Sequence, residues 1–510
     1  MESSAKRAAL VAVDLGAQSC RVSLLRWKQG QSQLHVIHRF PNAPIAREEG
    51  LHWDIGRIFD GVKDGLRLCA EAAPEGIASV GVDGWAVDYV RLDGNGDAIA
   101  DPFCYRDERT QEAEKKVHQI IPPSRLYRLT GIQLLGLNTI YQLYADKLAG
   151  RNSTSAWINL PEYVTFRLGG RRVAEYTNAT HTQLVRLGGQ EWSEEIFQGI
   201  GLDISAAPKI VPTGSIVGSI GGDLSNLLAL RNTKLIVPAC HDTASAIAAI
   251  PASGEDWAFI SSGTWSLVGT VLSSPCVSEE ARRMNFTNLG GAGRSICFLK
   301  NVNGMWLLRQ CMDEWEGRGT TVSVNELVPE CEGLPRPEFL IDVDDPPLTL
   351  PGDMLGKINR QLQRRGRPAF STESRDIPLI ANMIFHSMAE RYGEVLGSIA
   401  AITGKRLKRL FIVGGGSKNT LLNRLTAERT GLEVVRGSSE STTLGNFAIQ
   451  MAVLEGSGND TTGVAASAVA HWAEELAEPV FEAQQSRNGV RKVSMEGQGF
   501  AGTGWGHDED

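Results

Sequence analysis

The chain has 510 residues, more than one hydrophobic core normally supports, so two domains are expected. Hydrophobic residues make up 42% and charged residues 22%, which is typical of a globular protein, and the net charge of −8 argues against nucleic-acid or acidic-membrane partners. No apolar stretch is long enough to cross a bilayer, and the apolar run 8–13 is too short for a secretory signal, so a cytoplasmic location is expected.

The first half of the chain reads as strands, one helix and further strands. Strands are expected over 10–14, 21–27, 34–39 and 77–82, with an amphipathic helix over 55–73. Three antiparallel strands followed by a helix and another strand are typical of an α/β layer. Residues 107–201 are mostly helical in pattern, a strand begins at 236, a helix of small residues spans 244–250, and 251–256 is the expected domain boundary.

The second half opens with a meander of its own. Strands are expected over 257–260, 266–273 and 295–300, followed by a long, less regular insertion up to about residue 375. A helix over 377–402, a strand over 409–413, a helix from about 421, a strand over 433–435 and a helix over 443–454 follow. Residues 483–510 have the composition of a disordered tail. The second half thus repeats the strand meander of the first, and the repeated unit is a whole domain.

The eight cysteines are scattered along the chain. They form no Cys-x-x-Cys pair and no metal-ligand spacing, so free thiols in a reducing compartment are the better interpretation. The spacing leaves open whether any two of them form a disulfide.

Two small-residue hinges, one in each half, each join two β-runs directly. They are Gly16-Ala17 and Gly263-Thr264. Small residues let backbone N–H groups approach an anion closely, as phosphate cradles require. Taken singly, each hinge reads more readily as an ordinary hairpin turn. Taken together, they suggest two related domains that hold one polyphosphate.

Two aspartates stand where strands end. Asp14 precedes the first hinge, where a carboxylate can hold hydrated Mg²⁺ facing the phosphates or can simply cap the turn. Asp242 is placed to take a proton from an attacking hydroxyl, but Asp242 or Thr243 as the N-cap of the next helix is an equally good interpretation. His241 has no second ligand nearby in the sequence, which argues against a metal there.

Glycines and tryptophans give weaker signals. Gly414-Gly-Gly416 after a buried strand can open a slot for a base or phosphate, although a glycine turn required by packing is about as common. Neither GxxxxGK[ST] nor a strand-to-helix GxGxxG is present, which disfavours P-loop and dinucleotide-binding folds. Trp53, Trp85 and Trp306 lie beside polar clusters where sugars can stack, but most tryptophans belong to the core.

Several motifs together resemble the FGGY carbohydrate kinases of the sugar kinase/actin-like superfamily. In chain order they are Asp14-Leu-Gly-Ala17, Gly81–Asp88, Tyr105–Arg109, Glu175–Leu184, His241-Asp-Thr243, Ser261–Trp265, Asn288–Gly291, Lys300–Leu308, Ile412–Gly416 and Thr443–Asn446. The similarity is collinear from about residue 9 to about residue 482. It implies an α/β fold of two ribonuclease-H-like (actin-like ATPase) domains around a central cleft, with the sugar site in 1–252 and the ATP site in 253–482.

The resemblance also implies roles for individual residues. The ATP site would be formed by Ala17, Gln18, Ser19, Cys20, Arg21, Thr264, Arg309 and Gly416, with Asp14 near Mg²⁺. The ketose would be held by Ala86, His241, Asp242, Thr243 and Asn301, with Asp242 as the base for its 1-hydroxyl. Three positions depart from the family pattern: Cys20 and Ala86 stand where glycine is usual, and Arg309 stands where glutamine is usual. Cys20 implies a slightly tighter first phosphate turn.

The reaction implied is ATP-dependent phosphorylation of L-rhamnulose to L-rhamnulose 1-phosphate in L-rhamnose breakdown, a substrate that the run 175–184 favours. L-fuculose or L-xylulose is the nearest alternative, because one epimeric hydroxyl decides between such ketoses. A non-catalytic sugar sensor on the same fold is a second alternative, against which the retention of Asp14, Asp242 and both hinges argues. The sequence leaves the oligomeric state open between monomer and homodimer.

Overall fold

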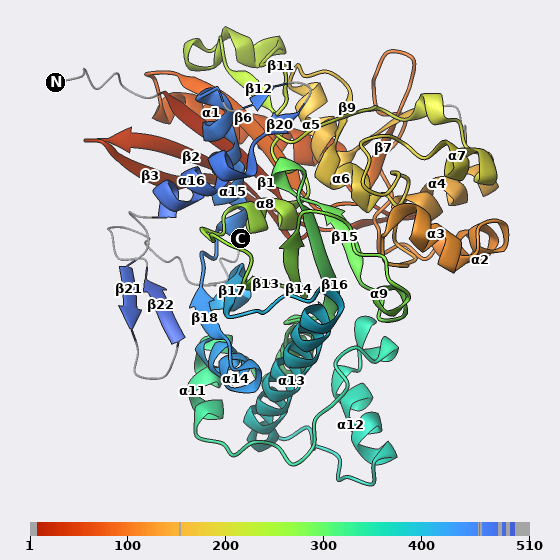
Figure 1. The fold of residues 1–510 in the computed structure, drawn as a ribbon, viewed down its shortest axis with the longest axis vertical. Coiled ribbons are helices and arrows are strands. Elements are labelled where there is room, and N and C mark those ends of the chain that lie inside the picture. The colour runs from red at the N-terminus through yellow and green to blue at the C-terminus, as the bar shows by residue number, and fades with distance from the viewer. Residues whose placement is uncertain are drawn as a thin grey trace.

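The computed structural model describes residues 8–151, 155–456, 458–459, 462–477, 482–485 and 490–494. These residues form two mixed α/β domains, each built on its own sheet (Figure 1). The expected α/β fold of two related domains is confirmed. All eight cysteines have free thiols.

The first sheet has the strand order β11-β12-β6-β1-β2-β3. β1, β2 and β3 are antiparallel, as the sequence predicts, while β6 lies parallel to β1 and β12 parallel to β6. Every residue of β1 is buried, which suits an apolar strand at the centre of a covered sheet. The strands are β1 (Ala9–Leu15), β2 (Ser19–Lys28), β3 (Gln31–Pro41), β6 (Ile77–Gly84), β11 (Ile216–Ser219) and β12 (Lys234–Ile236).

Helices and short strand pairs complete the first half of the chain. The apolar stripe of α1 packs on β2 and β3, and the Asp54 side chain caps its first turn. The helices are α1 (Ile55–Ala72), α2 (Thr110–Ile120), α3 (Pro123–Thr130), α4 (Thr139–Leu148), α5 (Leu160–Arg167), α6 (Tyr176–His181), α7 (Glu194–Ile200) and α8 (Asp242–Ala248). The short strands are β4 (Ile45–Arg47), β5 (Gly50–His52), β7 (Tyr89–Leu92), β8 (Ala156–Asn159), β9 (Val173–Glu175) and β10 (Lys209–Val211).

The second sheet repeats the same topology. Its order is β15-β16-β14-β13-β17-β18-β22-β21, with β13, β14 and β16 antiparallel and with β17 and β18 added in parallel beside β13. The strands are β13 (Trp257–Ser262), β14 (Trp265–Leu272), β15 (Thr287–Gly290), β16 (Ile296–Asn303), β17 (Arg409–Val413), β18 (Glu433–Arg436), β21 (Glu482–Gln485) and β22 (Val490–Ser494), with the separate pair β19 (Gly458–Asn459) and β20 (Gly463–Val464).

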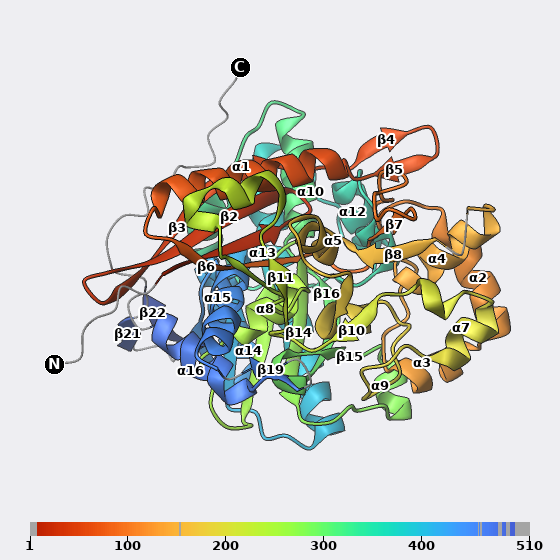
Figure 2. The same cartoon turned by 90° about the horizontal axis from the view of Figure 1, so that it is seen from above.

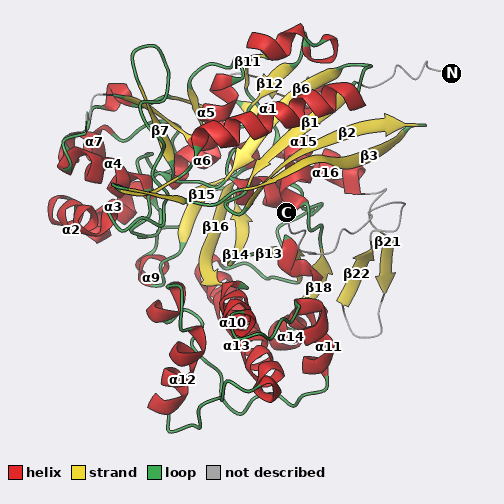
Figure 3. Cartoon of the chain, turned by 180° about the vertical axis from the view of Figure 1, so that it is seen from behind, coloured by secondary structure: helices red, strands yellow, loops and turns green. Residues whose placement is uncertain are grey.

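The insertion expected to be less regular consists of short helices and loops. Helices α10, α11 and α12 fill much of it and gather with α13 and α14 at one end of the molecule (Figure 3). Each is short and amphipathic and buries its apolar stripe in one cluster with α13, which explains the order. The helices of this half are α9 (Glu279–Arg283), α10 (Trp306–Glu316), α11 (Val324–Glu332), α12 (Met354–Arg364), α13 (Ile377–Thr403), α14 (Thr420–Thr430), α15 (Ser441–Leu454) and α16 (Ala466–Ala477).

Helices α8 and α15 lie side by side between the two sheets (Figure 2). Phe447 and Ile449 of α15 share a buried cluster with Leu10 of β1. On the other side, Ile247 of α8 shares a cluster with Phe259 of β13. Each helix therefore contacts the sheet of the other half, so α15 packs with the first sheet although it lies within the expected domain 253–482. That domain division stays a prediction.

The expected C-terminal tail and the length of the helices can also be compared with the described residues. Within the expected tail 483–510, the structure describes strand residues up to 485 and the strand β22, and the remaining residues of that segment lie outside the described residues. Among the described helices, including the 27-residue α13, none combines the length and apolar character needed to cross a bilayer.

Candidate active site

The carboxyl ends of β1 and β6 meet the loop that leads into α8. Asp14 and Asp83 stand directly opposite each other in the parallel register of the two strands. Gly84 forms a bridge with His241, and its N–H donates to the carbonyl of Cys240 at 3.0 Å. Ligands of open α/β sheets bind at such carboxyl ends. The charge of Asp242 acts on both Asp14 and Asp83, so the structure brings these three carboxylates together.

Arg21 contacts these carboxylates directly. The Arg21 guanidinium donates to Asp14 Oδ2 at 2.6 Å and to Glu440 Oε2, just before α15, at 2.7 Å. Burial raises the pKa of Asp14 although Arg21 opposes the rise, and burial together with the charge of Asp14 raises the pKa of Asp83 well above its usual range. Arg39 also lowers the pKa of Asp14, but the site still has more acidic groups than these two arginines.

A magnesium ion fits this excess of carboxylates. Oδ1 of Asp83 is buried and has no hydrogen-bond partner, and Mg²⁺ is usually held by one or two carboxylates together with water and phosphate oxygens. In the described part of the chain, no group of three or more His, Cys, Asp or Glu side chains is arranged to hold a metal by itself. Asp14 and Asp83 are the side chains that would hold the ion beside bound phosphates.

Asp242 is the first residue of α8. The N-cap is His241, so the interpretation of Asp242 or Thr243 as the N-cap is wrong. The Asp242 side chain remains 38% exposed, its Oδ1 accepts from the Thr243 hydroxyl at 3.1 Å, and it lies 3.5 Å from His241 Nε2. Desolvation by the surrounding protein raises the pKa of Asp242 to about 6. A reachable carboxylate with that pKa is suited to accept a proton near neutral pH.

The first hinge is a tight turn between β1 and β2. A side chain at Gly16 would meet the carbonyl oxygen of Ser19 at 2.4 Å, so the turn requires glycine. Ala17 and Ser19 are partly exposed and Gln18 is exposed, so these three are accessible to a ligand. Cys20 is buried in the core of the first domain, and burial raises its pKa to about 12. Its thiol donates to the carbonyl oxygen of Gly16 across the turn at 3.8 Å, and the expected tightening of the turn stays a prediction.

The second hinge is held by the start of α10. The N–H groups of Met305 and Trp306 donate to the carbonyls of Gly263 at 3.1 Å and Thr264 at 3.2 Å. Gly263 is exposed and Thr264 is partly exposed. The hinge is thus the equivalent of the first one in the second sheet, fixed by a helix and open to a ligand.

The other two residues predicted near the nucleotide lie in the second domain. Gly416 follows β17, and a side chain there would meet Ser262 Oγ of β13 at 2.0 Å, which supports the packing interpretation of this glycine. Arg309 on α10 is 52% exposed and pairs with Asp313 at 2.8 Å. The structure brings neither residue into contact with the cluster around Asp14.

The turn 85–88 carries Ala86, one of the residues predicted to bind the sugar. Asp88 accepts from the indole nitrogens of Trp53 at 2.6 Å and Trp85 at 3.0 Å, and both rings are nearly fully buried, so they belong to the core. Ala86 is also buried, and the next residue, Val87, has a φ of 72°, which β-branched residues rarely adopt. A strained residue beside Ala86 is consistent with a functional turn.

Asn301 of β16 reaches the first domain. Its Nδ2 donates to Gln133 Oε1 at 3.1 Å. The ring of Trp306, nearby in sequence, lies 5.2 Å from the Arg106 guanidinium of the first domain. These contacts connect the predicted sugar residue of the second half with the half that carries Asp242.

Sequence reasoning missed Asp83 and His181. Asp83 could have been found from the sequence, because like Asp14 it is an acidic residue at the end of a buried strand. His181 ends α6 and its ring centre lies 4.8 Å from that of His241. The two residues are 60 positions apart, and only the fold brings them together.

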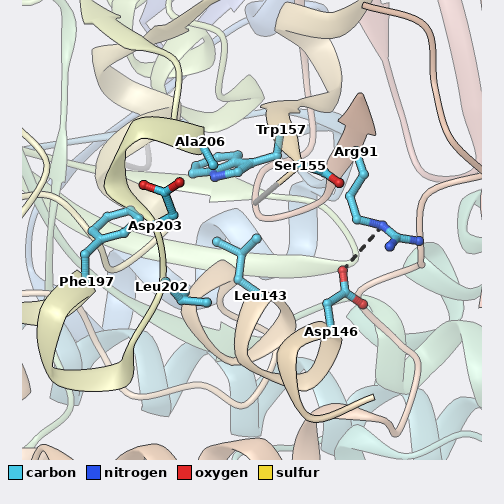
Figure 4. A pocket seen from close by; sticks show the side chains of 9 residues that line it. All are labelled: Arg91, Leu143, Asp146, Ser155, Trp157, Phe197, Leu202, Asp203 and Ala206. Atoms are coloured by element: carbon cyan, nitrogen blue, oxygen red, sulfur yellow. Dashed lines mark ion pairs between the residues drawn. The ribbon is translucent and has the colours of Figure 1, made fainter. Parts of the chain in front are cut away.

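A small hollow lies elsewhere in the first domain, between α4, α7 and β8 (Figure 4). None of its nine lining residues is a predicted site residue. Its one buried acidic group, Asp146, pairs with Arg109 at 2.8 Å and accepts from the Tyr89 hydroxyl at 2.6 Å. Because its charge is already compensated, we assign the hollow no role in the chemistry.

Comparison with known proteins agrees with this geometry. The sequence profile of the FGGY family of carbohydrate kinases, N-terminal domain, matches residues 9–249, and that of the C-terminal domain matches residues 258–454. The chain belongs to the FGGY family of carbohydrate kinases. As a member of this family it is a sugar kinase, and the hinges and carboxylates described above lie within the matched residues.

Relatives within the FGGY family are close in sequence. The chain is 37% identical to a rhamnulokinase from Bacteroides thetaiotaomicron over 89% of its own length and 92% of the relative's. It is 36% identical to a rhamnulokinase from Halalkalibacterium halodurans over 87% and 93%. Solved FGGY-like structures share the fold: a xylulose kinase from Lactobacillus acidophilus (TM-score 0.71, 16% identity, 92% and 97% coverage) and a Plasmodium falciparum glycerol kinase with ADP (TM-score 0.69, 14% identity, 95% and 94% coverage).

Proposed function

We propose that this sugar kinase transfers the γ-phosphoryl group of ATP to the 1-hydroxyl of L-rhamnulose. The observation that carries the proposal is the position of Asp242: partly exposed, at the start of α8 and beside Asp14, Asp83 and Arg21. The rhamnulokinase relatives, which match nearly the whole chain, support L-rhamnulose as the ketose. A ketose offers a primary hydroxyl at carbon 1 that can lie against Asp242.

In the proposed reaction, Asp242 accepts the proton of the 1-hydroxyl while the hydroxyl oxygen attacks the γ-phosphorus of ATP. The bond from the γ-phosphorus to the bridging oxygen breaks, and ADP leaves. Backbone groups of Ala17–Cys20 and of Thr264 would bind the phosphates from the two hinges, and Arg21 would supply positive charge. Bound Mg²⁺ would neutralise charge on the transferred group.

The remaining ligand contacts would be divided between the two domains. The ketose would lie on the first domain against Ala86, His241 and Thr243, with Asn301 reaching it from β16, while the adenosine would lie on the second domain near Arg309 and Gly416. The reaction would take place in the cytoplasm, where ATP is available. Monomer and homodimer both accommodate this proposal.

Steady-state kinetics with MgATP test the substrate. ADP release is measured with L-rhamnulose, L-fuculose, L-xylulose and glycerol, and the values of kcat/KM are compared. A site that hydrogen-bonds each hydroxyl rejects sugars that misplace one, so we expect a clear preference for L-rhamnulose. A ratio that favours L-fuculose, or a glycerol rate above both, would overturn this substrate and leave the sugar kinase activity intact.

A further inference from the structure

A second histidine lies at the candidate sugar site. His181 is the last residue of α6, and its ring stands edge-on to the ring of His241, with 4.8 Å between ring centres and 77° between ring planes. His241 in turn lies 3.5 Å from the Asp242 carboxylate. The two imidazoles therefore form one unit next to the group that faces the reacting hydroxyl.

The end of α6 also lies at the contact between the two domains. The hydroxyl of Thr180, the residue before His181, accepts from the backbone N–H of Gly290 in β15 at 2.9 Å. α6 therefore lies where first-domain and second-domain residues meet, the region in which Asn301 reaches Gln133. A side chain at this point is well placed to contact a substrate held between the domains.

Both rings have an unused nitrogen. Nδ1 of His181 and Nδ1 of His241 are buried and have no hydrogen-bond partner. The threonines around them behave differently, because Thr180 and Thr182 donate to backbone carbonyls of the same segment, at 2.9 Å and 2.6 Å. Buried polar atoms in folded proteins are normally paired. Other buried atoms, such as those of the Asn159 amide, are also unpaired here, but these two nitrogens belong to adjacent rings beside Asp242, where a partner from outside the chain can complete the pair.

The two rings are suited to a neutral, hydroxylated partner. Burial lowers the pKa of His181 to about 3 and that of His241 to about 4, so both rings are uncharged at neutral pH. An uncharged imidazole has one donor and one acceptor nitrogen. A sugar hydroxyl, which both donates and accepts, matches such a pair, whereas a phosphate group would find no charge there.

We propose that His181 is a specificity-determining residue that, together with His241, binds one secondary hydroxyl of the ketose. This inference rests on the proposed function, since it requires a ketose at Asp242. His181 would then discriminate between ketoses that differ in the configuration of that hydroxyl, while the proton is transferred to Asp242.

The test compares His181→Phe with wild type on the ketose that wild type prefers and on the analogues of that ketose lacking one hydroxyl each. Phenylalanine keeps the ring and removes both nitrogens. We expect kcat/KM for the full sugar to fall about tenfold or more, mostly through KM. With the analogue that lacks the contacted hydroxyl, the difference between variant and wild type should shrink to about twofold or less.

His118→Phe is the matched control. His118 is also partly buried and stacks edge-on to an aromatic ring, that of Tyr141 at 5.5 Å, but it lies on α2 outside the site. It should change kcat/KM by less than about twofold. His181→Gln, which retains hydrogen-bonding groups, should recover part of the loss and provides a second variant if the phenylalanine variant folds poorly.

The outcomes separate this inference from the proposed function. An equal loss on every analogue, or no loss on the full sugar, overturns the role of His181 while the kinase assignment stands. A wild-type preference for another ketose overturns only L-rhamnulose, and the comparison is then decided on that ketose. A wild-type protein that phosphorylates no ketose overturns both.

Discussion

The chemistry proposed at Asp242 depends on its protonation. A general base must be ionised, and desolvation raises the pKa of Asp242 to about 6, so the active form is lost as pH falls through that value. We expect log kcat/KM for the ketose to be level above about pH 7 and to fall with a slope of about one below pH 6. A pH–rate profile with saturating MgATP measures this. A profile that stays flat down to pH 5 would contradict the raised pKa or the role of Asp242.

At the same scale, the sequence predicts single residues better than pairs. Asp14 and Asp242 attract attention in the sequence because each stands at the end of a predicted strand. Asp83 lies opposite Asp14 only through the register of β1 with β6, and His181 meets His241 only through the fold. Cys20 departs from the family pattern at this turn, and its buried thiol contacts the Gly16 carbonyl oxygen, a contact that the local sequence does not reveal. Contacts between distant segments are not encoded in local patterns.

At the scale of elements, the packing of α8 against α15 depends on one close contact between their backbones. A side chain at Gly445 of α15 would meet the carbonyl oxygen of Ser245 in α8 at 1.8 Å, so Gly445→Ala must push α8 away. Because α8 carries Asp242 and α15 follows Glu440, the partner of Arg21, both stability and turnover should suffer. We expect a loss of about 1–3 kcal/mol in the free energy of unfolding and a kcat lowered about tenfold or more.

Gly397→Ala is the matched control for this prediction. Gly397 also lies inside a helix, α13, and a side chain there meets no atom within 4 Å. Alanine favours a helix over glycine, so this variant should be neutral or more stable by up to about 1 kcal/mol. Denaturant unfolding and steady-state kinetics of both variants provide the comparison. If Gly445→Ala matched the control in both measurements, α8 and α15 would not be in the contact described.

The elements themselves were predicted unevenly. The meanders follow from apolar runs joined by small or polar turn residues, and the helix α1 follows from one apolar stripe; the structure confirms both. The insertion after β16 was expected only to be less regular, and its helices were not predicted, because α10, α11 and α12 are short, separated by loops and stabilised by packing on α13. Tertiary packing of this kind outweighs the weak helical signal of each segment.

At the scale of the whole molecule, the two hinges belong to different sheets, so a polyphosphate held by both requires the domains to approach each other. Closure also excludes water from the transferred phosphoryl group. We predict a smaller radius of gyration by small-angle scattering when a ketose and a non-hydrolysable ATP analogue are both present. Each ligand alone provides the control. An unchanged scattering curve at saturating concentrations of both would count against closure.

The central claim is that Asp242 accepts the proton during phosphoryl transfer, and turnover of Asp242→Asn tests it most directly. Asparagine keeps the size of the side chain and removes the base, so with L-rhamnulose and MgATP we predict a kcat lower by about two to four orders of magnitude. The KM for the sugar should change much less, because the other sugar contacts remain. An Asp242→Asn protein that is folded and turns over at near wild-type rate would contradict the account.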